Sequence, residues 1–451
     1  MSESRIVVVG GGLAGMAAAL ACADAGARVT LIERRRRLGG ATWSFRHKGL
    51  WFDNGQHVFL RCCTHYRSFI QRLGVGDRVR LQPHLDLPVL APGGRAARLR
   101  RARMPAPLHL GRSLLSYEHL PLGDRLRLIP AALALRRVDT DHPETDGHTF
   151  ADWLRRHGQS PAAVETLWDL ICRPTVNLPA HEASLTLAAM VFQTGLLSDA
   201  RAADIGWASV PLGELHGDAG HDALRRAGVE VITGAPATRV TPSPTGAVCG
   251  VSVGSSQRAA DGVVVAVPHT ALNAIAGIPA PDDLVDRLGT SPIVNVHVIY
   301  DRAITDHEMA AAVGTTVQFV FDRTKASGLQ GGQCLAVSLS AADDEMSRSA
   351  EEVKARVIAS LAQLFPRATT ARVVDALVSR EPAATFRGRP GSHPARLPSK
   401  TAIPGLYLAG AWTDTGWPAT MEGAVRSGRI AARHALLAAG QTQHLPEEDV
   451  A

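Results

Sequence analysis

A glycine-rich turn between two short apolar segments near the N-terminus constrains the fold more than any other part of the chain. Residues 5–9 are apolar and mostly β-branched, which is typical of a buried strand. An alanine-rich helix is expected after the turn, and a second apolar segment, residues 28–32, ends at Glu33. This order of strand, turn, helix and acidic residue predicts a dinucleotide-binding α/β unit. The glycines that match the pattern G-x-G-x-x-G are Gly10, Gly12 and Gly15.

Each part of this unit has an expected role toward a nucleotide. The first glycine permits a tight turn, the second lets the backbone reach a pyrophosphate, and the third lets the helix pack on the strand. The helix N-terminus, at Leu13 and Ala14, offers unpaired N–H groups to the phosphates. We expect Glu33 to accept a hydrogen bond from a ribose hydroxyl group. Arg34 and Arg35 follow it and are candidates for nucleotide contact, although such a basic run also suits a solvated face.

Charge and cysteine content exclude several other classes of protein. The 451 residues include 48 basic and 42 acidic ones, a balance too mild to indicate nucleic-acid binding, and no nucleic-acid motif is present. The six cysteines form no C-x-x-C pair, so we expect no zinc site and no metal. We find neither a secretory signal nor a transmembrane segment, which favours a cytoplasmic protein with free thiols.

Two further segments have the composition of a cofactor site. Gly39 and Gly40 permit a close backbone approach, and residues 53–57 (Asp-Asn-Gly-Gln-His) place polar groups around a flexible glycine. Near the C-terminus, a predicted strand at 406–409 leads through a turn at Gly410 into a helix that begins near Thr420 and Met421. That second helix N-terminus can stabilise partial negative charge.

Taken together, these motifs resemble the FAD-dependent amine oxidase and carotenoid desaturase superfamily. The resemblance implies that FAD is the cofactor, that the N-terminal motif binds its ADP part, and that the backbone near Ala237 contacts the adenine. It also implies that Gly55, Gln56 and His57 pass close to the flavin, with the C-terminal helix at its other end. Where the superfamily has an acidic residue after the glycine of the C-terminal motif, this chain has Ala411, and Asp414 is the candidate substitute.

A narrower resemblance, to the squalene-associated FAD-dependent desaturases, rests on three segments: 53–57, 167–179 and 412–424. That family is assigned as hydroxysqualene dehydroxylases of squalene and hopanoid biosynthesis. The resemblance implies that an allylic hydroxyl group is protonated, that water leaves, and that N5 of reduced flavin gives a hydride to the allylic cation. The candidate proton donors are His57 and Asp53, beside the flavin motif, and Asp169 in the helical block, each with a structural role as the alternative. NADPH and a separate reductase both stay open as the reductant.

The predicted fold class is α/β, with a Rossmann-like FAD-binding domain of the amine oxidase and desaturase type. The second domain is a discontinuous substrate domain with a mixed sheet and a helical cap. We assign residues 1–73, 206–268 and 382–440 to the FAD-binding domain. The substrate domain comprises 74–205, expected to be a helical block, and 269–381; a flexible tail follows at 441–451.

Residues 95–137 combine arginine clusters with an apolar helical stretch, expected at 124–137. Such a segment is typical of membrane-surface contact, and equally of a helical cap with a solvated basic face. Because the implied substrate is a long apolar isoprenoid, we expect peripheral contact with the inner face of the membrane. The sequence does not fix the oligomeric state.

Two other functions remain open at this point. The first is oxidative chemistry on the same fold, as in a carotenoid-type desaturase or another flavin oxidase. The second belongs to a different class, a prenyl-lipid binding protein that keeps the fold without redox chemistry.

Overall fold

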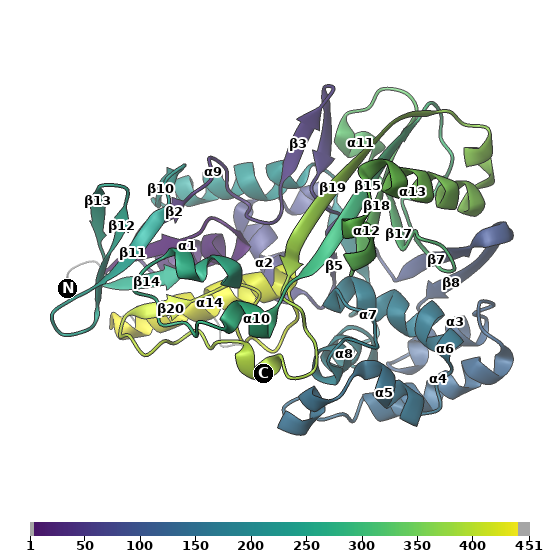
Figure 1. Ribbon diagram of the computed structural model, residues 1–451, viewed down its shortest axis with the longest axis horizontal. Coiled ribbons are helices and arrows are strands. Elements are labelled where there is room, and N and C mark those ends of the chain that lie inside the picture. The colour runs from purple at the N-terminus through teal and green to yellow at the C-terminus, as the bar shows by residue number, and fades with distance from the viewer. Residues whose placement is uncertain (1–3, 441–451) are drawn as a thin grey trace.

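A five-stranded parallel sheet forms the centre of one half of the molecule (Figure 1). In the computed structural model, which describes residues 4–440, its strand order is β10-β2-β1-β14-β20. The strands therefore come from three separate parts of the chain, and the tail expected at 441–451 lies outside the described residues. The strands are β1 (Arg5–Val9), β2 (Arg28–Glu33), β10 (Glu230–Thr233), β14 (Gly262–Val265) and β20 (Leu406–Leu408).

Both faces of this sheet are buried, as the apolar strand β1 requires. Ile6 and Val8 pack against helices on one face, and Val7 and Val9 pack toward the other, where the antiparallel sheet β11-β12-β13 lies. These layers form the α/β unit that the glycine turn predicts. The elements of the two faces are α1 (Leu13–Asp24), α2 (Thr64–Leu73), α9 (Ala219–Arg226), α14 (Met421–Ala438), β11 (Ala237–Pro242), β12 (Val248–Val253) and β13 (Ser256–Ala259).

The other half contains a seven-stranded sheet in the order β19-β15-β18-β17-β16-β7-β8. All its pairings are antiparallel except that between β16 and β7. Helix α13 (Ala350–Leu364) covers one face, where Val353, Val357 and Leu361 join the valines of β15 in one core. The strands are β7 (Asp86–Ala91), β8 (Arg95–Arg100), β15 (Ser291–Tyr300), β16 (Met309–Ala312), β17 (Phe319–Asp322), β18 (Gln333–Ser340) and β19 (Val373–Thr385).

A helical part lies beneath the second sheet in Figure 1, and its core contains Phe150, Trp168 and Phe192. The expectation that all of 74–205 is helical is wrong, because three strands lie between 79 and 100. Within residues 4–440, no helix combines the length and hydropathy needed to cross a bilayer. The main helices are α3 (Gly111–Leu115), α4 (Leu122–Leu135), α5 (Phe150–Arg156), α6 (Pro161–Ala163), α7 (Asp169–Val176) and α8 (Leu185–Phe192).

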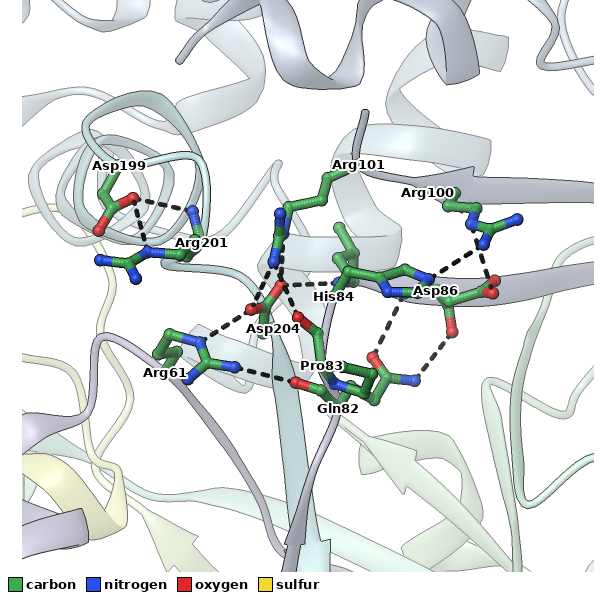
Figure 2. A network of polar contacts seen from close by, with 11 residues as sticks. Arg61, Gln82, Pro83, His84, Asp86, Arg100, Arg101, Asp199, Arg201 and Asp204 are labelled. Carbon is green, nitrogen blue, oxygen red and sulfur yellow. Dashed lines mark hydrogen bonds and ion pairs between the residues drawn. The ribbon is translucent and has the colours of Figure 1, made fainter. Parts of the chain in front are cut away.

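Asp204 fastens the helical part to a small sheet of β5 (Val58–Leu60), β9 (Ile205–Ala208) and β6 (Val79–Leu81), as Figure 2 shows. Its buried carboxylate accepts hydrogen bonds from Arg61 Nε and Arg101 Nε, each at 2.8 Å, and from the N–H of Leu85 at 2.7 Å. These charge-assisted bonds lower the pKa of Asp204 against the opposing effect of burial. Arg101 is therefore a structural residue.

Candidate functional site

The turn after β1 contains two glycines that no larger residue can replace. A Cβ built on Gly10, whose φ is +109°, would lie 2.4 Å from the carbonyl oxygen of Ala266. A Cβ on Gly15 would lie 1.8 Å from the carbonyl oxygen of Gly10. Gly12 differs, because the nearest atom to its built Cβ is Cα of Gly40, at 3.7 Å. Packing therefore requires the first and third glycines of the pattern, whereas the second one keeps its backbone accessible.

The N-terminus of α1 presents a group of backbone donors beside this turn. Within residues 4–440, the N–H groups of Gly12, Leu13 and Ala14 have no hydrogen-bond acceptor. The helix begins when Met16 N bonds to the carbonyl oxygen of Gly12 at 2.9 Å. Unpaired N–H groups at the positive end of a helix form a site for a phosphate. Gly40, with φ +57°, lies against this site.

Glu33 holds the turn at the end of β2. Its carboxylate accepts hydrogen bonds from the N–H of Gly11 at 2.6 Å and from the N–H of Arg35 at 2.8 Å. The side chain is buried, and each oxygen retains a second lone pair that can accept a ribose hydroxyl group. Glu33 thus fixes the backbone and keeps its predicted ligand-binding capacity.

The segment before Ala237 runs beside this carboxylate. Ala235 N bonds to the carbonyl oxygen of Glu33 at 3.2 Å, and Gly234 N bonds to that of Arg35 at 2.9 Å. Ala237, the first residue of β11, is partly exposed at this edge. The side chains of Arg34 and Arg35 are exposed, and their contact with a nucleotide stays a prediction.

The loop 53–57 is fastened to the seven-stranded sheet through the carbonyl oxygen of Asn54. This oxygen accepts hydrogen bonds from Asn295 Nδ2 at 3.1 Å and from Ser379 Oγ at 2.9 Å. The side chain of Asn54 donates to Glu381 Oε1 at 3.0 Å. Strands β15 and β19 therefore set the position of a loop that belongs to the other half of the molecule.

Asp53 is buried and has strong partners. Its carboxylate forms an ion pair with Arg323 Nη2 at 2.9 Å and accepts the N–H of Leu212 at 2.9 Å and the hydroxyl group of Ser44 at 2.6 Å. The loops around 44, 212 and 323 meet at this carboxylate. These contacts give Asp53 a structural reason for its place, and its role as a proton donor stays a prediction.

Gln56 and His57 lie at the inner end of the loop. Gln56 Nε2 is buried and has no hydrogen-bond partner among the described residues. Both residues line a small cavity together with Trp207, Phe321 and Arg323. Burial lowers the pKa of His57, although its Nδ1 lies 3.2 Å from the carbonyl oxygen of Gly55. The imidazole is therefore neutral at pH 7, beside a buried amide that lacks a partner.

The C-terminal motif forms a second helix N-terminus, at α14. The hydroxyl group of Thr420 accepts the N–H of Gly423 at 3.1 Å and caps the helix. Within residues 4–440, the N–H groups of Met421 and Glu422 have no acceptor. Like the unpaired N–H groups at the start of α1, these two donors need a hydrogen-bond acceptor. An electronegative group of a ligand would supply it.

Gly410 and Asp414 lie in the turn before α14. Gly410 has φ +135°, and its N–H donates to Ser427 Oγ at 2.8 Å. Asp414 is exposed and uses its N–H to bond to the carbonyl oxygen of Leu397 at 3.0 Å. Its substitution for the acidic residue of the superfamily stays a prediction.

Helices α1 and α14 lie in direct contact, as Figure 1 indicates. A Cβ built on Gly428 would lie 2.1 Å from the carbonyl oxygen of Ala14, so this glycine permits the contact. The two helix N-termini therefore belong to one rigid arrangement, although about 400 residues separate them in sequence.

Asp169 lies at the start of α7, in the helical part. Its Oδ1 accepts the N–H of Ala180 at 2.6 Å, and Oδ2 lies 3.4 Å from Arg173 Nη2. Burial raises the pKa of Asp169. No hydrogen bond or ion pair of residues 4–440 joins Asp169 to the loop 53–57.

Three buried charged residues of the site were not predicted from the sequence. Arg323 pairs with Asp53, Arg396 donates to the carbonyl oxygens of Thr413 and Trp417, and Glu422 accepts the N–H of Tyr66 at 2.7 Å. Neither arginine belongs to a local motif. Glu422 had a detectable signal, since it stands inside the Met-Glu-Gly run of the C-terminal motif.

A family model described as flavin containing amine oxidoreductase matches residues 13–436. The chain belongs to this family. It is therefore a flavin-containing oxidoreductase, its cofactor is FAD, and its α/β fold is that of the family. The membership gives no support to the alternative of a lipid-binding protein without redox chemistry.

The relatives include a hydroxysqualene dehydroxylase and several phytoene desaturases. The chain is 26% identical over 441 residues to a hydroxysqualene dehydroxylase from Zymomonas mobilis, with 95% of this chain and 98% of that relative covered. It is 25% identical over 457 residues to a 15-cis-phytoene desaturase from Narcissus pseudonarcissus, covering 95% of this chain and 79% of that relative. An oxidoreductase structure from Methanosarcina mazei has a TM-score of 0.72 at 17% identity, covering 94% of this chain and 98% of that one.

The residues of the site fit FAD. Unpaired N–H groups at α1, close approach of Gly12 to Gly40, and the free lone pairs of Glu33 suit the ADP part. The buried amide of Gln56 and the unpaired N–H of Met421 suit the polar edge of the flavin ring.

Proposed function

We propose that the protein removes the hydroxyl group of a long isoprenoid allylic alcohol reductively, and that hydroxysqualene is converted to squalene. One observation supports this choice over other reactions of the family. Among relatives matched over nearly their whole length, the dehydroxylase from Zymomonas mobilis is 26% identical over 98% of its chain, and a 15-cis-phytoene desaturase from Synechococcus elongatus is 23% identical over 95% of its chain. The specific motifs at 53–57, 167–179 and 412–424 agree with it.

The reaction breaks one C–O bond and forms one C–H bond. The hydroxyl oxygen takes a proton and leaves as water, and the allylic carbon takes a hydride. Reduced FAD supplies the hydride. Reduced nicotinamide or a reductase protein would then return two electrons to the enzyme.

The chain's own residues would exclude water, bind the apolar substrate and deliver one proton. Trp207 and Phe321, which line the small cavity beside His57, offer apolar surroundings of the kind that a carbocation needs. Among the proton-donor candidates, the raised pKa of Asp169 favours a proton on its carboxyl group, whereas the lowered pKa of His57 favours the neutral imidazole. Asp169 is therefore the better proton donor by its protonation state, whereas His57 is the better candidate by its place in the loop 53–57.

Anaerobic incubation of photoreduced protein with hydroxysqualene tests this function. We expect squalene to form while the flavin absorbance of the oxidised state returns. The matched control is oxidised protein with the same substrate, which should release no squalene. Absence of squalene from the reduced protein, when its flavin is fully bound, would contradict the proposal.

A carotenoid-type desaturase is the second candidate, favoured by the similarity to 15-cis-phytoene desaturase over 95% of this chain. A desaturase removes hydride from its substrate, so it needs oxidised FAD and an electron acceptor. Incubation of the oxidised protein with phytoene and a quinone distinguishes the two functions. Formation of new double bonds there, together with no squalene above, would favour the desaturase.

A further inference from the structure

Exposed apolar side chains gather on one region of the helical part. Of eleven large hydrophobic side chains exposed among residues 4–440, seven lie between Met104 and Leu133. Proteins rarely leave such a contiguous group to water, and one usually marks a binding surface. The seven residues are Met104, Leu108, Leu115, Leu122, Leu126, Ile129 and Leu133.

Helix α4 carries four of them on a single stripe. Leu122, Leu126, Ile129 and Leu133 follow one another at spacings of four, three and four residues, which places them along one side of a helix. The side chains of Leu128, Ala131 and Leu135 are buried against the core on the opposite side. Helix α4 is thus apolar on two faces, of which the core uses one.

Four arginines of the segments before and after α4 have no partner among the described residues. Arg103, Arg112, Arg136 and Arg137 are exposed, and none of them has a hydrogen bond or ion pair to another of the described residues. Three arginines in the second half of β8 and directly after it differ. Arg98 pairs with Asp86. Arg100 also pairs with Asp86, and Arg101 pairs with Asp204 (Figure 2). The four exposed arginines are therefore unpaired, whereas Arg98, Arg100 and Arg101 belong to ion pairs within the protein.

The charge of this face favours an anionic bilayer over a second copy of the chain as its partner. In a symmetric dimer the same face would meet its copy, and the unpaired arginines of the two copies would repel each other. Anionic lipid headgroups would neutralise these arginines while the leucines enter the region of the acyl chains. In Figure 1, α3 and α4 lie at the outer end of the helical part, at the lower right.

We propose that this α4 face, formed by the seven apolar residues and the four arginines, docks the protein on an anionic bilayer. The contact is peripheral, with α4 lying in the plane of the interface. The inference goes beyond the proposed reaction and holds equally for a desaturase, because either substrate dissolves in lipid.

Co-sedimentation of the flavin-loaded protein with vesicles tests the proposal. We expect binding to phosphatidylcholine vesicles with about one quarter phosphatidylglycerol, and weaker binding at high salt or to phosphatidylcholine alone. The double variant L126S/L133S should lose about tenfold or more in binding. The control V374S removes an equally exposed apolar side chain on β19 and should bind as the wild type does.

A second pair of variants tests the charges. R136Q/R137Q should weaken binding at low salt by about fivefold for each arginine, whereas R225Q/R226Q on α9 should not. Retained flavin absorbance shows that each variant is folded. Equal binding by L126S/L133S and V374S would overturn the proposal. Failure of the wild-type protein to bind anionic vesicles would also overturn it. So would a wild-type dimer that the substitutions L126S/L133S dissociate.

Discussion

Arg323 Nη2 lies 2.9 Å from Asp53 Oδ2, and both side chains are buried. Asp53 is the last residue of the strand Leu50–Asp53, and Arg323 follows β17 of the seven-stranded sheet. The arginine also donates to the carbonyl oxygens of Ala208 and Val210. One guanidinium group thus joins three segments, 270 residues apart at the extremes.

Replacing Arg323 with leucine should lower the free energy of unfolding by about 3–5 kcal/mol, since Asp53 would keep a buried charge without a partner. Urea unfolding followed by tryptophan fluorescence measures this change. R302L removes an exposed arginine from its pair with Asp301 and should cost less than about 1 kcal/mol. The double variant D53N/R323L should recover part of the loss; equal losses for R323L and R302L would contradict a structural role.

The glycines of the site should separate into two groups. G428A places a Cβ where Ala14 has its carbonyl oxygen, so both flavin content and unfolding free energy should fall, the latter by about 1–3 kcal/mol. G12A meets no atom closer than 3.7 Å, so the fold should tolerate it while flavin content falls. Flavin absorbance per protein and urea unfolding measure the two quantities. Full flavin content in G12A would show that the phosphate does not lie at this backbone.

Stability should decrease as the pH falls below about 6.5, the ordinary pKa of histidine. Burial lowers the pKa of His216 to about 3 and that of His297 to about 4. Below pH 6.5 these histidines are therefore protonated in the unfolded chain and neutral in the folded protein. For each histidine, the free energy of unfolding falls by about 1.4 kcal/mol per pH unit. Unfolding free energies measured between pH 6.5 and 4 give the slope. H297Q should reduce it, and an unchanged slope would contradict the assignment.

Glu422 should stabilise the contact between α14 and α2. Its carboxylate accepts the N–H groups of His65 at 3.2 Å and Tyr66 at 2.7 Å. E422A should cost about 1–3 kcal/mol, because these N–H groups become buried without an acceptor. The control E165A removes an exposed carboxylate and should change stability by less than about 0.5 kcal/mol. Similar values for both variants in urea unfolding would argue against this contact.

The sequence predicted those parts of the site whose residues are neighbours in the chain. The glycine turn, Glu33 and the helix N-termini at Leu13 and Met421 each belong to a local pattern with a physical requirement. In the structure Glu33 bonds to the glycine turn, and α14 packs on α1 at Gly428. Arg323 and Arg396 could not be predicted, because their partners are set by tertiary packing and no spacing rule applies to them. The basic run at 95–100 was expected in a helical block but forms strand β8. Ala97 and Leu99 alternate with arginines and are buried, and the strand pairs with β7.

The contact between α1 and α14 has a consequence for biosynthesis. The N-terminal helix leaves the ribosome first, but the helix that completes its packing follows about 400 residues later. At translation rates of about 5–20 residues per second, this interval lasts roughly 20–80 s. During that time the face of α1 that packs on α14 has no permanent partner. A site that needs both helices is therefore completed late in synthesis, when Gly428 reaches Ala14.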